Sequence, residues 1–299
     1  MKVLVVIVTY NAMPWIDRCL TSLRESVESL DVMVIDNLST DETQERIKTN
    51  YPEVILSVSN QNLGFGQGNN IGLKYALEHN YDYVYLLNQD AWIYPDTIQK
   101  LIQTQQEHPE YGILSPLQLQ SDGKQLDSIF SDLTCGFESN NRLVSDLFLS
   151  YRKDVYEVTS VMAAHWLVSK ACLEKVGGFS PSFFQYGEDD NYLDRAKHFG
   201  FKIGIVPEAK AIHARENRPY SRKKTIERLY ISNVLVMSKV ENRKKNPFLY
   251  VFLNCIRNMF KYTSVKPIGQ FFRVLANCGK IRRNYLASLK PGAFIKDTD

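Results

Sequence analysis

The chain has 299 residues, of which 44% are hydrophobic and 23% charged, a composition typical of a globular protein with a sizeable core. Its five cysteines lie far apart with no CxxC pair, which argues against a disulfide framework or a zinc site and favours a cytoplasmic setting. The apolar run 3–8 is too short to span a membrane and lacks a signal-peptide cleavage pattern. It is therefore predicted to be a buried strand.

Charge is distributed unevenly along the chain. Residues 1–214 contain 17 Lys and Arg against 28 Asp and Glu, whereas residues 215–299 contain 19 against 5. A basic tail on an acidic body predicts peripheral contact with an anionic surface, such as the inner face of the plasma membrane. Packing of the tail on the core, or a homodimer, is the alternative. Nucleic-acid binding is not favoured, because no recognised binding motif accompanies the charge.

The first 120 residues alternate strand and helix patterns. The predicted strands are 3–8, 31–35, 54–58, 83–87 and 112–115. The predicted helices are 14–30, 39–49, 70–78 and 95–107, and a Gly- and Asn-rich loop, 64–72, leads into the third. Strands separated by helices indicate an α/β fold with a doubly wound, mostly parallel sheet and helices on both faces. The strand ends at 9–11, 36–39, 60–69 and 88–90 should converge on one crevice.

The second half of the chain is less regular. A strand is predicted at 157–161, helices at 169–176 and 188–198, a strand at 201–206, and a basic tail that is helical and amphipathic at 249–260 and 269–289. We expect one domain over 1–217, with a nucleotide-binding half (1–120) and an acceptor or catalytic half (121–217). A basic helical extension, 218–299, would follow.

Three of the predicted strand ends carry candidate ligand groups. Asp36 could accept hydrogen bonds from a base or ribose, or simply cap the end of its strand. The glycines of 60–70 would let the backbone approach a ligand, although the segment is neither a Walker A loop nor a GxGxxG motif. Asp90 could bind Mg²⁺ or Mn²⁺, or cap the next helix.

Two further features lie later in the sequence. Glu188, Asp189 and Asp190 are consecutive acids at a predicted helix start. The helix dipole favours acids there, yet adjacent carboxylates repel one another, which indicates a general base and a group that holds a substrate hydroxyl. His213 is an isolated histidine after a short apolar pair, and it is either structural or a metal ligand beside Asp90.

Five motifs, in this order, resemble those of family 2 glycosyltransferases. They are VTYN at 8–11, VIDNLSTD at 34–41, NLGFGQGNNIG at 62–72, LLNQD at 86–90 and GEDD at 187–190. The resemblance covers about 1–215 and fits best the rhamnosyltransferase-like enzymes of bacterial surface polysaccharide synthesis. It implies a GT-A fold, a nucleotide-diphosphate sugar donor, a divalent metal (Mn²⁺ or Mg²⁺) and inversion at the anomeric carbon.

The resemblance also implies roles for individual residues. The donor-binding residues would be Thr9, Tyr10, Asn11, Asp36, Asn37, Asn62, Gly68, Asn69, Asn88, Gln89 and Asp90. Residues 88–90 take the place of the family's DXD motif, so that Asp90 is the main acidic metal ligand and His213 assists it. Asp189 aligns with the acid usually assigned as the base, with Glu188 and Asp190 close enough to leave that assignment open.

The expected reaction transfers a sugar, with dTDP-rhamnose favoured as donor, to a hydroxyl of a saccharide or lipid-linked saccharide. A nucleotidyltransferase is one alternative, but it would carry a basic Gly-rich loop after the first strand, and 10–14 contains no Gly, Lys or Arg. A dinucleotide-dependent oxidoreductase is disfavoured for the same reason. A catalytically silent subunit that binds nucleotide sugars is the other alternative.

Overall fold

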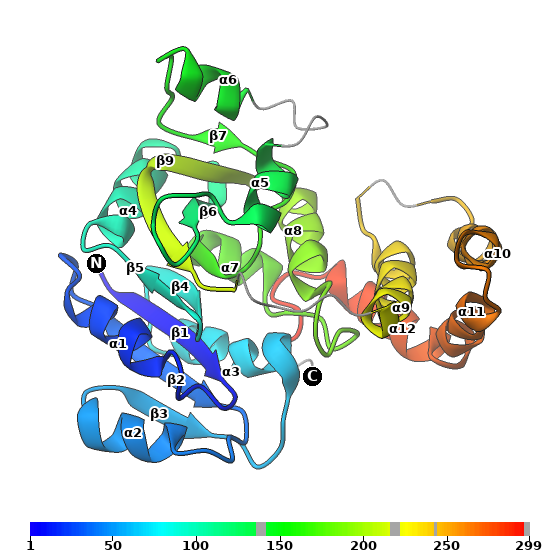
Figure 1. Ribbon diagram of the computed structural model, residues 1–299, viewed down its shortest axis with the longest axis horizontal. Coiled ribbons are helices and arrows are strands. Elements are labelled where there is room, and N and C mark those ends of the chain that lie inside the picture. Colours follow the sequence, from blue (N-terminus) through cyan, green and yellow to red (C-terminus); the bar gives the residue numbers. More distant parts are fainter. Residues whose placement is uncertain (136–141, 216–221, 242–243, 296–299) are drawn as a thin grey trace.

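The computed structural model describes residues 1–135, 142–215, 222–241 and 244–295, without the side chains of 135 and 222–227. These residues form a nine-stranded sheet in the order β3-β2-β1-β4-β8-β6-β9-β5, with β7 paired to β9 (Figure 1). The strands are β1 (Val3–Thr9), β2 (Asp31–Asp36), β3 (Ile55–Val58), β4 (Tyr83–Asn88), β5 (Ala91–Ile93), β6 (Tyr111–Leu119), β7 (Tyr156–Glu157), β8 (His165–Ser169) and β9 (Lys202–His213).

The order of the strands separates a parallel half from a mixed half. Strands β3, β2, β1 and β4 run parallel, as the alternating pattern of 1–88 predicts. Strand β8 lies antiparallel between β4 and β6, and β6 pairs in parallel with β9. The carboxyl ends of β1, β2 and β4 therefore open on one edge, beside the end of β9.

Helices cover both faces of the sheet, which confirms the predicted α/β architecture. One face packs against α3 (Gly64–Glu78) and α7 (Lys170–Val176), with Leu73 and Leu173 in the shared core. The other face packs against α1 (Ile16–Arg24), α2 (Thr43–Asn50) and α4 (Thr97–Glu107). The remaining helices of this part are α5 (Ser128–Cys135), α6 (Leu143–Phe148) and α8 (Glu188–His198).

The predicted loop at 64–72 is wrong, because these residues form the first turns of α3. A Cβ at Gly68 would lie 2.9 Å from the Val8 side chain, and one at Gly72 would lie 2.5 Å from Val6. The two glycines are four residues apart and so share a face of the helix. They let α3 approach β1 more closely than any side chain would allow, which explains a helix rich in glycine.

Three other predictions differ from the structure. The predicted strand 157–161 is confined to β7, and the first helix is shorter than 14–30. The predicted strand 201–206 and the apolar pair before His213 belong to one strand, β9, whose register shifts after Val206. Pro207 lies in that irregularity, where a missing N–H costs no ladder hydrogen bond.

The C-terminal tail is helical, as predicted, and lies beside α8 (Figure 1). Its helices are α9 (Arg222–Ser238), α10 (Pro247–Tyr262), α11 (Lys266–Ala276) and α12 (Cys278–Ser288). They share an apolar cluster with Phe183, and Asn284 Nδ2 donates a hydrogen bond to Ser182 Oγ at 2.8 Å. The tail thus packs on the segment that leads into α8. No helix in the described ranges has both the length and the apolarity to span a bilayer.

Candidate active site

A cavity of about 370 Å³ opens at the carboxyl ends of β1, β2 and β4. Segments from all four predicted strand ends line it, which confirms that they converge on one crevice. Helix α8 and the end of β9 complete the wall of the cavity. The lining residues are Val8, Thr9, Tyr10, Asn37, Asn62, Gly64, Phe65, Asn88, Gln89, Asp90, Met162, Ala163, Ala164, Phe184, Gln185, Tyr186, Glu188, Asp189, His213 and Arg215.

Asp36 lies behind this wall and does not line the cavity. Its Oδ1 accepts hydrogen bonds from the backbone N–H of Ser39 (3.0 Å) and from Gln44 Nε2 (2.8 Å). Its Oδ2 accepts hydrogen bonds from Thr9 Oγ1 (2.9 Å) and Ser39 Oγ (2.6 Å). Protein donors occupy four acceptor positions of this buried carboxylate, which therefore ties the ends of β1 and β2 together.

Three other predicted donor-binding residues also lie outside the lining. Asn11 has φ of 51°, and its Oδ1 accepts a hydrogen bond from the Thr40 backbone N–H at 2.8 Å. Gly68 packs on β1, and Asn69 Nδ2 donates to the carbonyl of Phe65 within α3. Gly68 and Asn69 lie inside the wall because the predicted loop is a helix, whereas Asn11 is hydrogen-bonded to the segment that follows β2.

Two asparagines of the lining organise the start of α3. Asn37 Oδ1 accepts a hydrogen bond from the Leu63 N–H (2.8 Å), and Asn37 Nδ2 donates to Asn62 Oδ1 (3.1 Å). Asn62 Oδ1 also accepts from the N–H of Gly64 (2.9 Å), which has φ of 75°. A Cβ at Gly64 would overlap the carbonyl oxygen of Phe184, so glycine brings the α3 start against the 182–187 segment.

Gln89 holds the end of β1 in place. Its Oε1 accepts a hydrogen bond from the Tyr10 N–H at 2.7 Å, and its Nε2 donates to the Tyr10 carbonyl at 3.3 Å. The Tyr10 side chain itself is largely exposed at the rim of the cavity. The middle residue of the Asn-Gln-Asp segment is thus engaged with the backbone, while Asn88 and Asp90 flank it in the lining.

His213 lies between two buried carboxylates. Its Nε2 is 3.7 Å from Asp90 Oδ1 and its Nδ1 is 3.9 Å from Asp127 Oδ2. Burial opposes ionisation of Asp127, but two hydrogen bonds from Arg215, each of 2.8 Å, outweigh it and hold the pKa of Asp127 below its usual value. Sequence reasoning missed Asp127 and Arg215.

The Asn88, Asp90 and His213 side chains form a donor set that fits Mn²⁺ or Mg²⁺. Asn88 Oδ1 and His213 Nδ1 are buried without a hydrogen-bond partner among the described residues, and Asn88 Nδ2 lies 3.4 Å from His213 Nε2. Buried polar atoms are normally paired, so the unpaired Asn88 Oδ1 is available to a cation. His213 Nδ1 faces Asp127, and only Nε2 faces Asp90. Carboxylate, amide and imidazole groups together suit a divalent cation of this class.

A second histidine, His165, contacts the end of β9. His165 is fully buried, its Nε2 lies 3.0 Å from the Ile212 carbonyl, and its Nδ1 lies 2.8 Å from the Tyr85 hydroxyl. Burial lowers the pKa of His165 to about 3. A neutral ring that donates from Nε2 and accepts at Nδ1 satisfies both contacts. His165 therefore orients the strand that carries His213.

The acids of α8 are divided between two sides of the helix. Glu188 and Asp189 line the cavity, whereas Asp190 faces outward and accepts a hydrogen bond from Ser160 Oγ at 3.1 Å. Glu188 is 5% exposed, and its Oε2 has no hydrogen-bond partner among the described residues. Burial, reinforced by the charge of Asp189, raises the pKa of Glu188, and burial with the charge of Asp190 raises that of Asp189.

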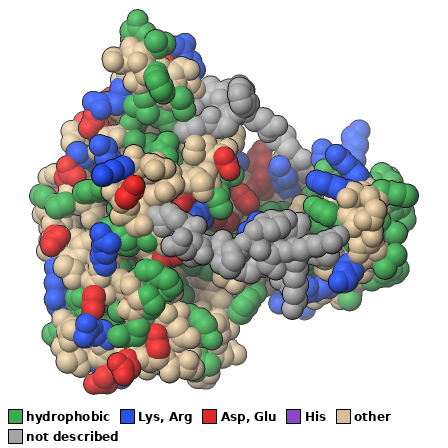
Figure 2. Space-filling model, in the orientation of Figure 1, with side chains coloured by type: hydrophobic (Ala, Val, Ile, Leu, Met, Phe, Trp, Pro, Cys, Tyr) green, Lys and Arg blue, Asp and Glu red, His purple; other side chains and the backbone are tan. Residues whose placement is uncertain are grey.

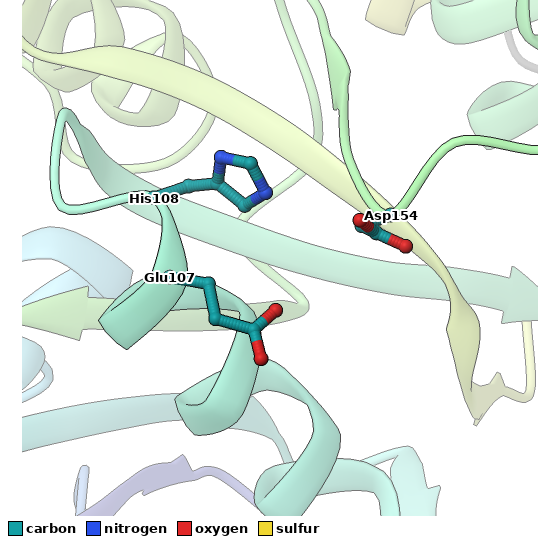
Figure 3. A group of neighbouring side chains, drawn as sticks. All are labelled: Glu107, His108 and Asp154. Atoms are coloured by element: carbon teal, nitrogen blue, oxygen red, sulfur yellow. The ribbon is translucent and has the colours of Figure 1, made fainter.

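A separate group of ligating side chains lies at the opposite edge of the sheet (Figure 3). Glu107 and His108, at the end of α4, and Asp154, before β7, bring one potential ligand atom each within 4.8 Å of the others. In the described part of the chain this is the one group of three or more His, Cys, Asp or Glu with that spacing. Both carboxylates are exposed, and none of the three residues lines the cavity described above.

The sequence matches the model of glycosyl transferase family 2 over residues 4–177, more than half of the chain. The chain belongs to glycosyl transferase family 2. An N-acetylglucosaminyl-diphospho-decaprenol L-rhamnosyltransferase of Mycobacterium tuberculosis is 29% identical over 234 residues, 70% of this chain and 75% of the relative. The dTDP-rhamnosyl transferase RfbF of Shigella flexneri is 24% identical over 210 residues, 70% and 68% of the two chains. This family 2 member is therefore rhamnosyltransferase-like.

Solved structures are similar to this family 2 glycosyltransferase over nearly its whole length. The mannosyltransferase PcManGT from Pyrobaculum calidifontis, in complex with GDP-Man and Mn²⁺, has a TM-score of 0.59 at 19% identity and covers 96% of this chain and 74% of its own. The S. aureus TarS 1–349 complex with UDP has a TM-score of 0.56 at 17% identity, and the match covers 97% of this chain and 81% of the TarS chain. This chain covers 42% of a longer TarS structure. These likenesses confirm the GT-A fold.

Among the residues that sequence reasoning missed, one had a local signal in the sequence and the others had none. Arg215 comes two positions after His213, so a basic residue directly past a strand end was a usable signal. Asp127 belongs to an irregular stretch with no motif. Met162, Ala163 and 184–186 also line the cavity, and the sequence has no local signal for them.

Proposed function

We propose that this glycosyltransferase moves a sugar from a nucleotide-diphosphate donor to an acceptor hydroxyl, with inversion at the anomeric carbon. The observation that carries the proposal is the pairing of two features in one cavity. Glu188 and Asp189, whose pKa values are raised, share its wall with the cation-binding set of Asn88, Asp90 and His213. Groups with separated pKa values beside a site for a leaving diphosphate suit a direct displacement.

Asp189 is the proposed base. It would accept the proton of the acceptor hydroxyl as that oxygen attacks the anomeric carbon, and the bond to the diphosphate would break on the opposite face. The pKa of Glu188 is raised further than that of Asp189, so Glu188 would stay protonated and donate a hydrogen bond to the sugar or acceptor. Asp190, which faces Ser160, would have no part in the chemistry.

The donor diphosphate is proposed to lie beside β4 and the end of β9. When bound to Asn88, Asp90 and His213, Mn²⁺ or Mg²⁺ would neutralise negative charge that grows on the diphosphate. Arg215 lines the same cavity and is fixed by Asp127, so its guanidinium would bind phosphate oxygens in a set orientation. Thr9, Tyr10, Asn37 and Asn62 would contact the nucleoside end. Asp36, Asn11, Gly68 and Asn69 would hold these residues in position from within the wall.

The proposed substrates are inferred from the names of two related enzymes. The similarity to a dTDP-rhamnosyl transferase supports dTDP-rhamnose as donor, and the mycobacterial relative supports an acceptor built on a lipid diphosphate. Surface polysaccharide synthesis at the cytoplasmic face would be the setting.

Donor turnover in the presence of Mn²⁺ tests the proposal. We expect release of nucleoside diphosphate from a dTDP-sugar to require the metal and to increase when a saccharide-lipid acceptor is added. Nuclear magnetic resonance of the product would show the inverted anomer. Binding of the donor with no turnover under any of these conditions would instead identify a catalytically silent subunit, and release of pyrophosphate from a nucleoside triphosphate would identify a nucleotidyltransferase.

We also propose that 1–217 is the catalytic domain and that the helical extension, 218–299, lies on a membrane. The segment 244–276, which includes α10 and α11, carries six Lys and Arg and no Asp or Glu. Its exposed apolar side chains include Phe260, Val265 and Phe272, at 78%, 71% and 63% exposed. Figure 2 shows basic and apolar side chains next to one another on the tail. Anionic headgroups and a shallow apolar layer complement such a surface.

Vesicle co-sedimentation of the full-length chain tests this contact. We expect binding to vesicles that contain anionic lipid, weaker binding to neutral vesicles and loss in high salt. The variant F260S/V265S changes two exposed side chains and should bind less without losing stability. Absence of sedimentation with anionic vesicles would reject the membrane contact, and equal sedimentation with neutral and anionic vesicles would reject the role of the basic residues. The predicted homodimer stays a prediction.

A further inference from the structure

A second cavity, of about 460 Å³, adjoins the first. Phe184, Gln185 and Tyr186 belong to the lining of both, so this short segment is a shared wall. The far side of the second cavity is formed by α9 and α11 of the tail. Its lining residues are Ser182, Phe183, Phe184, Gln185, Tyr186, Arg228, Tyr230, Ile231, Val234 and Arg273. It is therefore a site between the sheet domain and the tail.

The cavity is lined by two arginines, by a group of apolar side chains and by the polar residues Ser182 and Gln185. Arg228 and Arg273 line it, and no Asp or Glu is among its described lining residues. Arg273 lies over the ring of Tyr230 at 4.2 Å and Arg228 lies 5.9 Å from the ring of Tyr186. A guanidinium that lies over a ring, as that of Arg273 does, keeps its N–H donors free at the edge, which suits bidentate contact with phosphate.

The apolar part of the wall is well supported. Phe183 and Val234 are buried members of the tail cluster, and Ile231 packs beside them. A Cβ at Gly187, which has φ of 86°, would lie 2.6 Å from the Ile231 side chain. Glycine at this position thus lets α9 close against the start of α8. Such a wall binds a hydrocarbon chain, and two cations bind a doubly charged head next to it.

We propose that the second cavity binds the diphosphate and the first isoprenoid units of a lipid-linked acceptor. This inference rests on the proposed function and deepens it by assigning the acceptor subsite. The shared wall leads directly into Glu188 and Asp189, so a saccharide attached to the diphosphate would extend past 184–186 toward the proposed base. Helix α11 carries Arg273 in the cavity and Phe272 exposed beside it, which offers the lipid chain a path to the membrane surface.

Calorimetric titration of the full-length chain tests the subsite without any donor. The probes are farnesyl diphosphate below its micelle concentration, farnesol and inorganic pyrophosphate. We expect farnesyl diphosphate to bind at least ~10-fold more tightly than either of the others, because it alone offers both the head and the chain. The variant R228Q/R273Q should lose at least ~10-fold of that affinity.

A matched control removes the same charge from the same tail. R282Q/R283Q changes two exposed arginines of α12 that do not line the cavity, and its affinity for farnesyl diphosphate should stay within about 2-fold of the unmodified chain. Arg273→Gln alone, at an exposed position of α11, repeats the test should the double variant not fold.

Each contrary result would overturn one stated part of the proposal. Equal affinity in R228Q/R273Q and the unmodified chain would overturn the subsite. Pyrophosphate binding as tight as that of farnesyl diphosphate would overturn the isoprenoid part, and farnesol binding as tight would overturn the role of the arginines. Metal-dependent hydrolysis of a dTDP-sugar without acceptor is measured on the same variants. If that hydrolysis persists while farnesyl diphosphate binding is absent, the subsite fails and the proposed function stands.

Discussion

Acids at the two ends of the candidate active site are held in opposite conditions. At the sheet end, Asp36 accepts four hydrogen bonds and Asp127 accepts two from Arg215. At the α8 end, Glu188 is equally buried, yet one of its oxygens has no hydrogen-bond partner among the described residues. The pKa of Asp127 is lowered by Arg215 against the effect of burial, whereas burial raises the pKa of Glu188.

This contrast separates two uses of a carboxylate. Hydrogen-bond donors around an acid stabilise its charged form and fix its geometry, as a frame for a phosphate or metal site requires. Burial without donors favours the neutral form and leaves the group ready to exchange a proton near neutral pH. The sheet end therefore suits binding, and the α8 end suits proton transfer.

The largest effect is expected at Asp189. Asp189→Asn removes the proposed base and should lower kcat for transfer by about 10²–10⁴-fold, with the fold retained. The neighbouring Asp190→Asn is the matched control, because Asp190 faces Ser160, and it should change kcat by less than about 3-fold. Steady-state assays of both variants with the same donor and acceptor decide between the two acids. A larger loss in the Asp190 variant would reverse the assignment.

The next effect is expected at Asp90. Asp90→Asn should lower transfer by roughly 100-fold, or about 3 kcal/mol, and raise the Mn²⁺ concentration needed for half-activation. Glu107→Gln, in the exposed group at the far edge of the sheet, is the control and should leave the Mn²⁺ response unchanged. Chelation with EDTA should abolish transfer by the unmodified chain. If the Mn²⁺ response changed in the Glu107 variant and not in the Asp90 variant, the metal site would lie outside the cavity.

A substitution of Asp36 tests whether the hydrogen bonds to this carboxylate stabilise the folded protein. Asp36→Asn replaces an acceptor of four hydrogen bonds with an amide, and the free energy of unfolding should fall by about 2–3 kcal/mol. The exposed Asp132→Asn should change it by less than about 0.5 kcal/mol. Urea denaturation of the three proteins gives these values. An Asp36 variant as stable as the control, but unable to bind donor, would instead support direct contact with the nucleotide.

The smallest effect is expected at Glu188 and has the opposite sign. Because the folded-state pKa is raised, the folded protein binds more protons than the unfolded chain between the ordinary carboxyl pKa and the raised one, and stability falls as pH rises through this window. Glu188→Gln removes this loss. Its Tm should exceed that of the unmodified chain by at least ~2 °C at pH 8.5 and by less at pH 5. A lower Tm at both pH values would instead show that the Glu188 carboxylate stabilises the folded protein.

The parallel half of the fold could be predicted from the sequence, and so could most of the cavity. Continuous apolar strands ended by polar residues, such as 3–8 followed by Thr9, follow from the pattern alone. The glycines of 64–72 could not be interpreted in this way, because their reason is the side chains of Val6 and Val8 on another element. Strand β8 was equally hidden, since its antiparallel place between β4 and β6 depends on pairing.

The sequence by itself determined which residue types end the strands and which acids begin α8, because strand ends and helix starts are local properties of the chain. The tertiary structure decided what each acid does. Asp36 is enclosed by donors, Asp127 is held by Arg215 from 88 residues away, and Glu188 is buried without enough donors. Charge and proton affinity depend on neighbours brought together by folding, so the pKa of Asp127 is lowered while that of Glu188 is raised.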